Sequence, residues 1–237
     1  MAGVPCTFKL VNAGGSLGGV VGWTSATAES HPSTADTNGQ DIGYTARASY
    51  DRQSWFAVPT TSFDEQSGCL TIRLTPATST VYIAYHEPYS LERHADLIAR
   101  SIAPRNAVRC THKVLGQTLD GRDMDLLTLG SGPRKVWLIG RQHPGETMAS
   151  WFFEGFLERL LDASDSASQK LLRDATLFLV PNMNPDGSYR GHLRTNAVGS
   201  NLNREWATPT AERSPEVLCV RDEIDRCGID FMMDVHG

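Results

Sequence analysis

Short stretches that are either apolar throughout or alternate between apolar and polar residues fill the N-terminal part of the chain and predict β-strands rather than helices. These stretches occupy 7–11, 42–49, 55–58, 70–74 and 81–85. Short strands at close spacing, separated by turn residues, are typical of antiparallel sheets that pack face to face. The pattern therefore predicts an N-terminal antiparallel β-sandwich domain that spans residues 1–104.

The spacing of apolar residues becomes helical after Pro88. Ser90 is a natural N-cap, and apolar side chains recur at helical spacing from Leu91 to Ile102. Pro104 cannot continue a helix, so the helix is expected to stop before it. We place a domain boundary directly after this residue, at 104/105.

Strands alternate with helices over the rest of the chain. Strands are predicted at 108–115, 124–129, 135–140, 177–180 and 231–235, and helices at 147–162, 167–174 and 214–227. Asp120 and Gly121, between the first two of these strands, are typical hairpin-turn residues. The alternation predicts an α/β domain over 105–237, with a mostly parallel or mixed sheet and helices on both faces.

Composition and charge exclude several classes of function. The formal net charge of the 237-residue chain is -5, and no basic run with interleaved aromatic residues is present, so no nucleic-acid partner is expected. No apolar stretch approaches the ~20 residues of a membrane-spanning helix, and no secretion signal is recognisable. The five cysteines are odd in number and form no Cys-x-x-Cys pair, which favours a reduced, cytoplasmic protein. Nothing in the sequence sets an oligomeric state.

Two histidines and a glutamate follow the ends of predicted strands. His143 and Glu146 come after the strand 135–140, and His236 comes after the strand 231–235. Ligand sites in open α/β sheets lie at the carboxyl ends of strands, and catalytic zinc takes three such ligands plus one open position. His-x-x-Glu by itself is a weak motif, and each histidine could be an ordinary loop residue. The combination predicts a zinc site.

The loop 181–213 is the second region with candidate chemistry. It follows the strand 177–180, is rich in Asn, Arg and Gly, and is long enough to favour a functional role. The guanidinium groups of Arg194 and Arg204 could hold a carboxylate bidentately or stabilise an oxyanion. A salt bridge that braces the loop is the alternative interpretation for each arginine.

Four motifs in this order resemble the M14 zinc metallocarboxypeptidases, and most of all the cytosolic carboxypeptidase subfamily with its bacterial members. The motifs are His-Pro-Gly-Glu at 143–146, Asn-Pro-Asp-Gly at 184–187, Arg-Gly-His-Leu-Arg at 190–194 with Asn-Leu-Asn-Arg-Glu-Trp at 201–206, and Asp-Val-His-Gly at 234–237. Residues 55–59 and 81–90 are similar to the β-sandwich domain of that subfamily. The resemblance covers nearly the whole chain and implies a carboxypeptidase-like α/β domain.

The resemblance implies hydrolysis of the C-terminal amino acid of peptides or proteins, with one Zn²⁺ per chain. His143, Glu146 and His236 would hold the metal. Arg194 would polarise the scissile carbonyl as the catalytic arginine. Asn203 and Arg204 would bind the free C-terminal carboxylate of the substrate.

The chain departs from the family pattern after its third expected zinc ligand. In the family, the general-base Glu, a substrate-covering Tyr and the specificity-pocket residues follow that ligand, whereas this chain stops at Gly237. The expectation is therefore a partial domain with an exposed apolar sheet edge, from a fragment or a truncated gene product. A chain without the base is expected to be inactive or nearly so.

Two other functions fit some of the same residues. A zinc-dependent acyl-amino-acid deacylase can share the His-x-x-Glu pair, the distant His and a carboxylate-binding Arg, but the β-sandwich and residues 190–194 argue against it. The other alternative, from a different class, is a non-catalytic zinc-binding or peptide-binding module.

Overall fold

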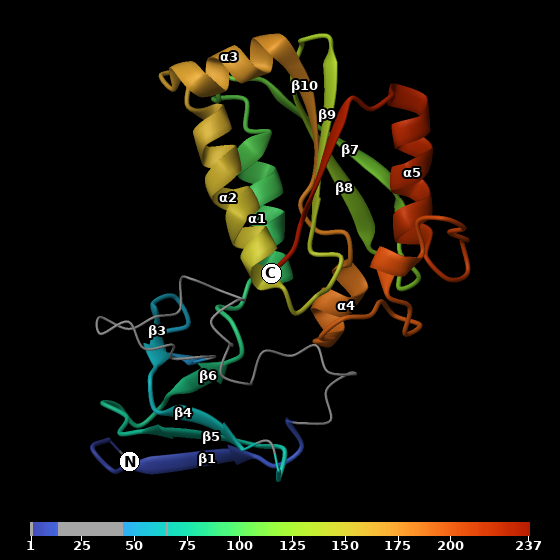
Figure 1. Cartoon of the computed structure of the whole chain (residues 1–237). Coiled ribbons are helices and arrows are strands. Elements are labelled where there is room, and N and C mark those ends of the chain that lie inside the picture. The colour runs from blue at the N-terminus through green and yellow to red at the C-terminus, as the bar shows by residue number, and fades with distance from the viewer. Residues whose placement is uncertain (1, 14–44, 65) are drawn as a thin grey trace. The chain divides into compact units, whose positions relative to one another are not determined.

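A computed structural model describes residues 2–13, 45–64 and 66–237 and divides the chain into two compact units, Met1–Glu87 and Pro88–Gly237 (Figure 1). Helix α1 (Leu91–Ser101) belongs to the second unit, whereas the sequence-based boundary at 104/105 assigned it to the first. The physical reason is packing. Leu97 and Ile98 of α1 share a core with strands of the second unit, and Arg93 forms an ion pair with Glu154.

Within its described residues, the first unit contains two antiparallel sheets of three strands each. One sheet has the order β1 (Cys6–Leu10), β5 (Cys69–Leu74), β4 (Thr61–Asp64), and the other has the order β3 (Trp55–Val58), β2 (Ala46–Ser49), β6 (Tyr82–Ala84). Ala48 and Val58 from one sheet share a core with Leu70 and Ile72 from the other. The predicted antiparallel β-sandwich is therefore confirmed. Strand β4 was not predicted, and residues 42–44 of the predicted strand 42–49 lie outside the described residues.

The second unit is built on one mixed sheet of five strands. The strands are β7 (Cys110–Gln117), β8 (Asp123–Gly130), β9 (Arg134–Gly140), β10 (Ala175–Val180) and β11 (Phe231–Val235), in the order β11-β9-β10-β8-β7. β9 is parallel to both β10 and β11, while β8 is antiparallel to β10 and β7. Gly121 adopts φ +78° in the hairpin between β7 and β8, as its turn position requires. The predicted mixed α/β sheet is confirmed.

Helices cover both faces of this sheet. Figure 1 shows α1, α2 (Thr147–Leu161) and α3 (Ser166–Asp174) on one side and α5 (Pro215–Cys227) on the other. Successive residues of β9 point to opposite faces, so Leu138 packs in the core under α2. Its neighbour Trp137 packs in the core under α5. This double burial explains why the strand reads as a continuous apolar run.

Strand β11 forms one edge of the sheet. Its Phe231 and Met233 side chains are 54% and 42% exposed. Among the described residues, no helix combines the length and the apolar character needed to cross a bilayer.

The loop 181–213 has more regular structure than its sequence suggested. It contains helix α4 (Pro185–Arg190) and the 3₁₀ helix η2 (Leu202–Arg204). Asn184 caps α4 by accepting a hydrogen bond from the backbone N–H of Gly187, and Pro185 occupies the first turn. The Asn-Pro-Asp-Gly motif is therefore a helix start, although it reads as a turn.

Candidate metal centre

The pairing of β9 with β11 brings the two predicted histidine ligands to the same edge of the sheet. The strands are parallel, and Val235 at the end of β11 is opposite Gly140 at the end of β9. His236 follows Val235 directly, and His143 follows Gly140 within the next turn. Residues far apart in the sequence thus meet at the carboxyl ends of two neighbouring strands, as predicted.

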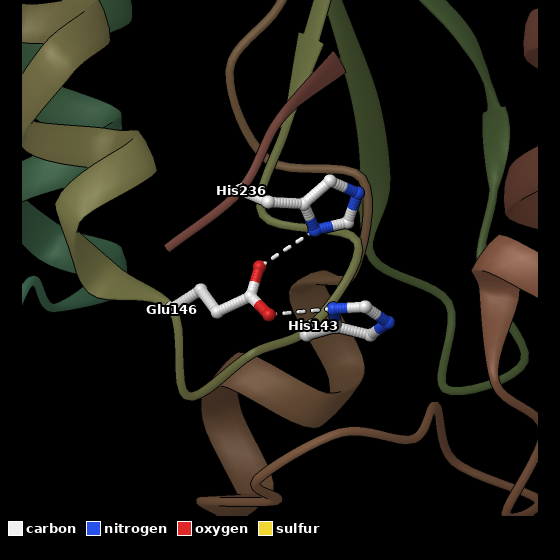
Figure 2. Close-up of side chains that lie close together, drawn as sticks. All are labelled: His143, Glu146 and His236. Carbon is white, nitrogen blue, oxygen red and sulfur yellow. Dashed lines mark hydrogen bonds and ion pairs between the residues drawn. The ribbon is translucent and has the colours of Figure 1, made fainter. Parts of the chain in front are cut away.

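The Glu146 carboxylate lies between the two imidazole rings (Figure 2). Its Oε1 atom is 2.7 Å from Nδ1 of His143, and its Oε2 atom is 2.7 Å from Nδ1 of His236. The candidate ligand atoms of the three residues all lie within 4.8 Å of one another. Within the described ranges, this is the one group of three or more His, Cys, Asp or Glu side chains close enough to share a metal ion.

The outer nitrogen of His143 bonds to an amide oxygen. Its Nε2 atom is 3.1 Å from Oδ1 of Asn201, which also accepts a hydrogen bond from the backbone N–H of Asn203. A backbone N–H can only donate, so this contact fixes the oxygen of the amide toward the imidazole. The Nε2 atom of His143 must therefore carry the proton.

The outer nitrogen of His236 bonds to a carboxylate. Its Nε2 atom is 2.8 Å from Oδ2 of Asp234, which can only accept while ionised. Nε2 is therefore the protonated nitrogen in both rings, and each neutral ring turns the lone pair of Nδ1 toward Glu146. Second-layer partners of this kind fix the tautomer and the orientation of metal-binding histidines.

This arrangement of donors fits a divalent cation. A neutral imidazole has one N–H and one lone pair, so it cannot donate both to its outer partner and to Glu146. Without a proton, each Nδ1 lone pair faces a carboxylate oxygen, which is repulsive. The repulsion disappears if both rings are protonated and donate to Glu146, or if one cation binds both lone pairs and the carboxylate. Two imidazoles and one carboxylate are a donor set of catalytic zinc sites, and the residues present fit that metal.

The pKa shifts at the site favour the charged form of Glu146. Burial raises the pKa of Glu146, but His143 and His236, whose Nδ1 atoms can donate to it when the rings are protonated, outweigh burial and leave the pKa below its ordinary value. Burial lowers the pKa of His236, but Glu146 and Asp234 outweigh it and raise the pKa. Glu146 is therefore ionised at neutral pH and ready to bind a cation, while protons compete with metal for His236 at acid pH.

Two glycines let the loop 181–213 lie against the ligand turn. The backbone N–H of Gly145 donates to the Leu193 carbonyl at 2.9 Å, and a Cβ atom on Gly145 would lie 2.9 Å from that oxygen. A Cβ atom on Gly187 would lie 2.3 Å from Cγ of Pro144. Glycine is therefore required on both sides of this contact.

Arg194 follows Leu193 and so is held beside the ligand turn. Its side chain is half-buried, and it makes no hydrogen bond or ion pair with the part of the chain that the structure describes. Asn203 lies beside the centre, with its Nδ2 atom 3.5 Å from Nε2 of His236. Arg204 is exposed, and its Nη1 atom donates to the Asn203 carbonyl at 2.9 Å. The structure thus places Asn203 beside the three predicted ligands. Arg194 and Arg204 lie near the two ends of the loop segment 194–204.

Three further residues of the site were not assigned a role from the sequence. Asn201 and Asp234 bond to the outer nitrogens of the histidines, and Gln142 donates to Asp234 through Nε2. Gln142 is itself held by the indole N–H of Trp206, which donates to Oε1 at 2.9 Å. These residues could have been suspected from the sequence only because each lies within two positions of a predicted site residue.

Comparison with known families agrees with this geometry. The zinc carboxypeptidase (peptidase M14) family matches residues 98–227, and the cytosolic carboxypeptidase N-terminal domain matches residues 1–86. The first match covers more than half of the chain, so the chain belongs to the zinc carboxypeptidase family. The carboxypeptidases of this family are zinc-dependent.

Individual relatives include cytosolic and bacterial carboxypeptidases. An uncharacterized protein of Zymomonas mobilis is 59% identical over 194 residues, which are 82% of this chain and 50% of that protein. Cytosolic carboxypeptidase 4 of Mus musculus is 36% identical over 154 residues, 57% of this chain and 14% of that protein. The solved structure of a Pseudomonas aeruginosa metallo-carboxypeptidase is 43% identical with a TM-score of 0.82, and the match covers 100% of this chain and 57% of that one. The chain thus spans about half the length of these two bacterial relatives.

Proposed function

We propose that this chain provides the metal centre and the carboxylate-binding residues of a zinc-dependent metallocarboxypeptidase, which hydrolyses the C-terminal amino acid of peptides or proteins. The observation that carries the proposal is the convergence of His143, Glu146 and His236, with both Nδ1 atoms turned toward the carboxylate. These three residues would hold one Zn²⁺ per chain. The match to the cytosolic carboxypeptidase N-terminal domain supports a cytoplasmic location.

The residues around the metal have separable tasks. Zinc in this position would polarise the scissile carbonyl and lower the pKa of water to about 7. Asn201 and Asp234 hold the two imidazole rings in the tautomer that leaves Nδ1 free for the metal. Arg194, which has no partner among the described residues, would donate to the carbonyl oxygen as negative charge develops on it.

Recognition of a chain end follows from the second arginine. The exposed guanidinium of Arg204, with the Asn203 amide beside it, would bind the free C-terminal carboxylate through paired hydrogen bonds. An internal peptide bond offers no carboxylate, so the guanidinium would stay unpaired and binding would weaken. The solved structure of the Pseudomonas aeruginosa relative is a complex with (2-guanidinoethylmercapto)succinic acid, and a carboxylic acid ligand in that relative supports this assignment.

Binding of matched peptides tests the proposal. Zinc-loaded protein is titrated calorimetrically with one peptide as the free acid and as the C-terminal amide. We expect the acid to bind at least about tenfold more tightly, because one charge-assisted bidentate pair contributes 1.4 kcal/mol or more. Arg204→Met should remove the preference. Arg159→Met is the matched control, because Arg159 is an exposed arginine on α2 that pairs with Asp165.

Each outcome separates the possible functions. Equal binding of acid and amide would contradict the carboxylate clamp, and zinc content near zero in the purified protein would contradict the metal centre. Hydrolysis is measured as release of C-terminal Glu, Lys or Phe, and release that His143→Ala leaves unchanged would contradict the proposed chemistry. Cleavage of N-acylated amino acids in preference to peptides would indicate a deacylase.

A further inference from the structure

Arg141 is a buried cation immediately before the first predicted metal ligand. Its side chain is 4% exposed, and it has no acidic partner among the described residues. Burial lowers the pKa of Arg141 to about 10. Burying a charge without an opposite charge is costly, so such a residue persists only where its hydrogen bonds compensate.

The guanidinium of Arg141 joins three segments of the second unit. Its Nε atom donates to the Pro144 carbonyl at 3.1 Å, inside the His143–Glu146 turn. Its Nη1 atom donates to the Tyr89 carbonyl at 2.9 Å, just before α1, and to the Ser150 hydroxyl at 3.3 Å, in the first turn of α2. A planar guanidinium can reach acceptors in several directions from one fixed plane, which the single ammonium of lysine cannot do.

The backbone at Arg141 is also strained. Its φ of +56° lies in the left-handed region, which costs a residue with a side chain roughly 1 kcal/mol. This conformation turns the chain sharply after Gly140, at the end of β9, so that the side chain bonds back to Pro144. Strain and a buried charge therefore coincide at the one residue that leads from the strand into the ligand turn.

We propose that Arg141 is a positioning residue for the metal centre, whose guanidinium holds the Pro144 carbonyl and thereby presets His143 and Glu146 for a cation. It acts through the turn, because none of its hydrogen bonds goes to a predicted ligand. The inference rests on the proposed function for the identity of the metal. Loss of the guanidinium should loosen the turn and weaken metal binding before the fold itself is lost.

Metal affinity and metal geometry test the role. Zinc affinity is measured by competition with a chelator for the wild type, Arg141→Lys and Arg141→Met, and the visible spectrum of the Co²⁺-substituted protein reports the ligand geometry. We expect Arg141→Met to weaken zinc binding about 10- to 100-fold, the usual effect of removing an outer partner of a metal ligand. Arg141→Lys should weaken it less, and both variants should change the Co²⁺ spectrum.

Arg93→Met is the matched control. Arg93 lies on α1 and forms two hydrogen bonds of 2.8 and 2.7 Å with Glu154 of α2, so its loss also uncouples the two helices. Neither of these hydrogen bonds goes to the ligand turn. We expect Arg93→Met to lower the urea midpoint of the metal-free protein while zinc affinity and the Co²⁺ spectrum stay at wild-type values.

The outcomes distinguish positioning from simple stabilisation. Wild-type zinc affinity and Co²⁺ spectrum in Arg141→Met would overturn the proposal, whatever the loss of stability. If Arg141→Met does not fold, Arg141→Lys decides, and unchanged affinity and spectrum in that variant would overturn it. A wild-type protein that binds no zinc would contradict the proposed function instead.

Discussion

Nε2 of His143 lies 3.1 Å from Oδ1 of Asn201, although the two residues are 58 positions apart in the sequence. The same oxygen accepts the backbone N–H of Asn203 and so caps η2, the segment that carries Asn203 and Arg204. One amide oxygen thus anchors both the first predicted metal ligand and the predicted carboxylate clamp. Disturbing it should affect both functions together.

Replacing Asn201 tests this shared anchor. Asn201→Ala should weaken zinc binding about 10- to 100-fold, since the tautomer of His143 is no longer fixed. It should also weaken binding of a peptide acid, because η2 loses a cap that contributes about 1 kcal/mol. Chelator competition and peptide titration measure the two effects. Asn201→Asp keeps the acceptor and should retain zinc binding.

Asn106→Ala is the control for this variant. Asn106 also holds a helix end, since its Nδ2 atom donates to the carbonyls of Arg100 and Ser101, but it lies after α1 and away from the ligand turn. Zinc and peptide binding should stay unchanged in Asn106→Ala. Equal zinc affinities in the Asn106 and Asn201 variants would refute the role given to Asn201.

Gly145 tests the close contact between the ligand turn and the loop. Gly145→Ala places a Cβ atom 2.6 Å from Cδ1 and 2.9 Å from the carbonyl oxygen of Leu193. The side chain can move away but the backbone must shift, so we expect a loss of about 1–3 kcal/mol in unfolding free energy. Peptide binding should weaken as well, because Arg194 follows Leu193. Urea unfolding and peptide titration measure these effects.

Gly155→Ala is the opposite case in the same part of the chain. A Cβ atom on Gly155, inside α2, would meet no atom within 4 Å. Alanine is favoured over glycine in a helix, so this variant should gain about 0.5–1 kcal/mol. If both variants changed stability in the same direction, the contact of Gly145 with Leu193 would not be the cause.

Metal binding should appear as added stability. A ligand that binds only the folded state contributes about 2.7 kcal/mol at a free concentration of 100 times its Kd. We therefore expect excess zinc to raise the unfolding temperature of the wild type relative to protein in chelator, and Glu146→Gln to abolish most of the increase. Glu158→Gln changes an exposed carboxylate of α2 and should show the full zinc-dependent increase in unfolding temperature. An equal increase in all three proteins would argue against the site.

Local sequence signals predicted most of the second unit. The apolar run at 136–139 gave β9, and Ser90 caps α1 as expected, with its hydroxyl accepting the N–H of Arg93. Ser214, Pro215 and Glu216 marked the start of α5 correctly. The convergence of His143 and His236 was also predictable, because both follow strands that end at the same edge of a sheet.

Features that depend on distant partners were not predictable in this way. Helix α4 is short and contains both Pro185 and Gly187, so its local preference for helix is weak. It is held instead by Asp186, which accepts hydrogen bonds from the Thr118 hydroxyl at 2.7 Å and from Arg122 at 2.8 Å. The role of Asn201 likewise depends on folding of the loop onto His143, which is 58 positions earlier in the sequence.

Glu216 is a fully buried carboxylic acid beneath the loop that carries Arg194. The Nδ2 atom of Asn196 lies 3.3 Å from each of its carboxyl oxygens, and Asn196 in turn accepts the backbone N–H groups of Val198 and Ser200. Burial, assisted by the charge of Asp186, raises the pKa of Glu216 to about 7. The contact between Glu216 and Asn196 thus holds the loop in place through a carboxyl group that titrates near neutral pH.

Stability should therefore fall as Glu216 ionises. The folded-state pKa of about 7 lies above the ordinary value of 4.5, so this group's contribution is fully present below pH 4.5 and is lost as pH rises through 7. Between pH 5 and 8 the loss should be on the order of 2 kcal/mol. Glu216→Gln cannot ionise and should not show this loss, so its unfolding free energy relative to the wild type should increase with pH. Urea unfolding in chelator measures this, with exposed Glu212→Gln as the control; parallel pH profiles for wild type and Glu216→Gln would exclude Glu216 as the titrating group.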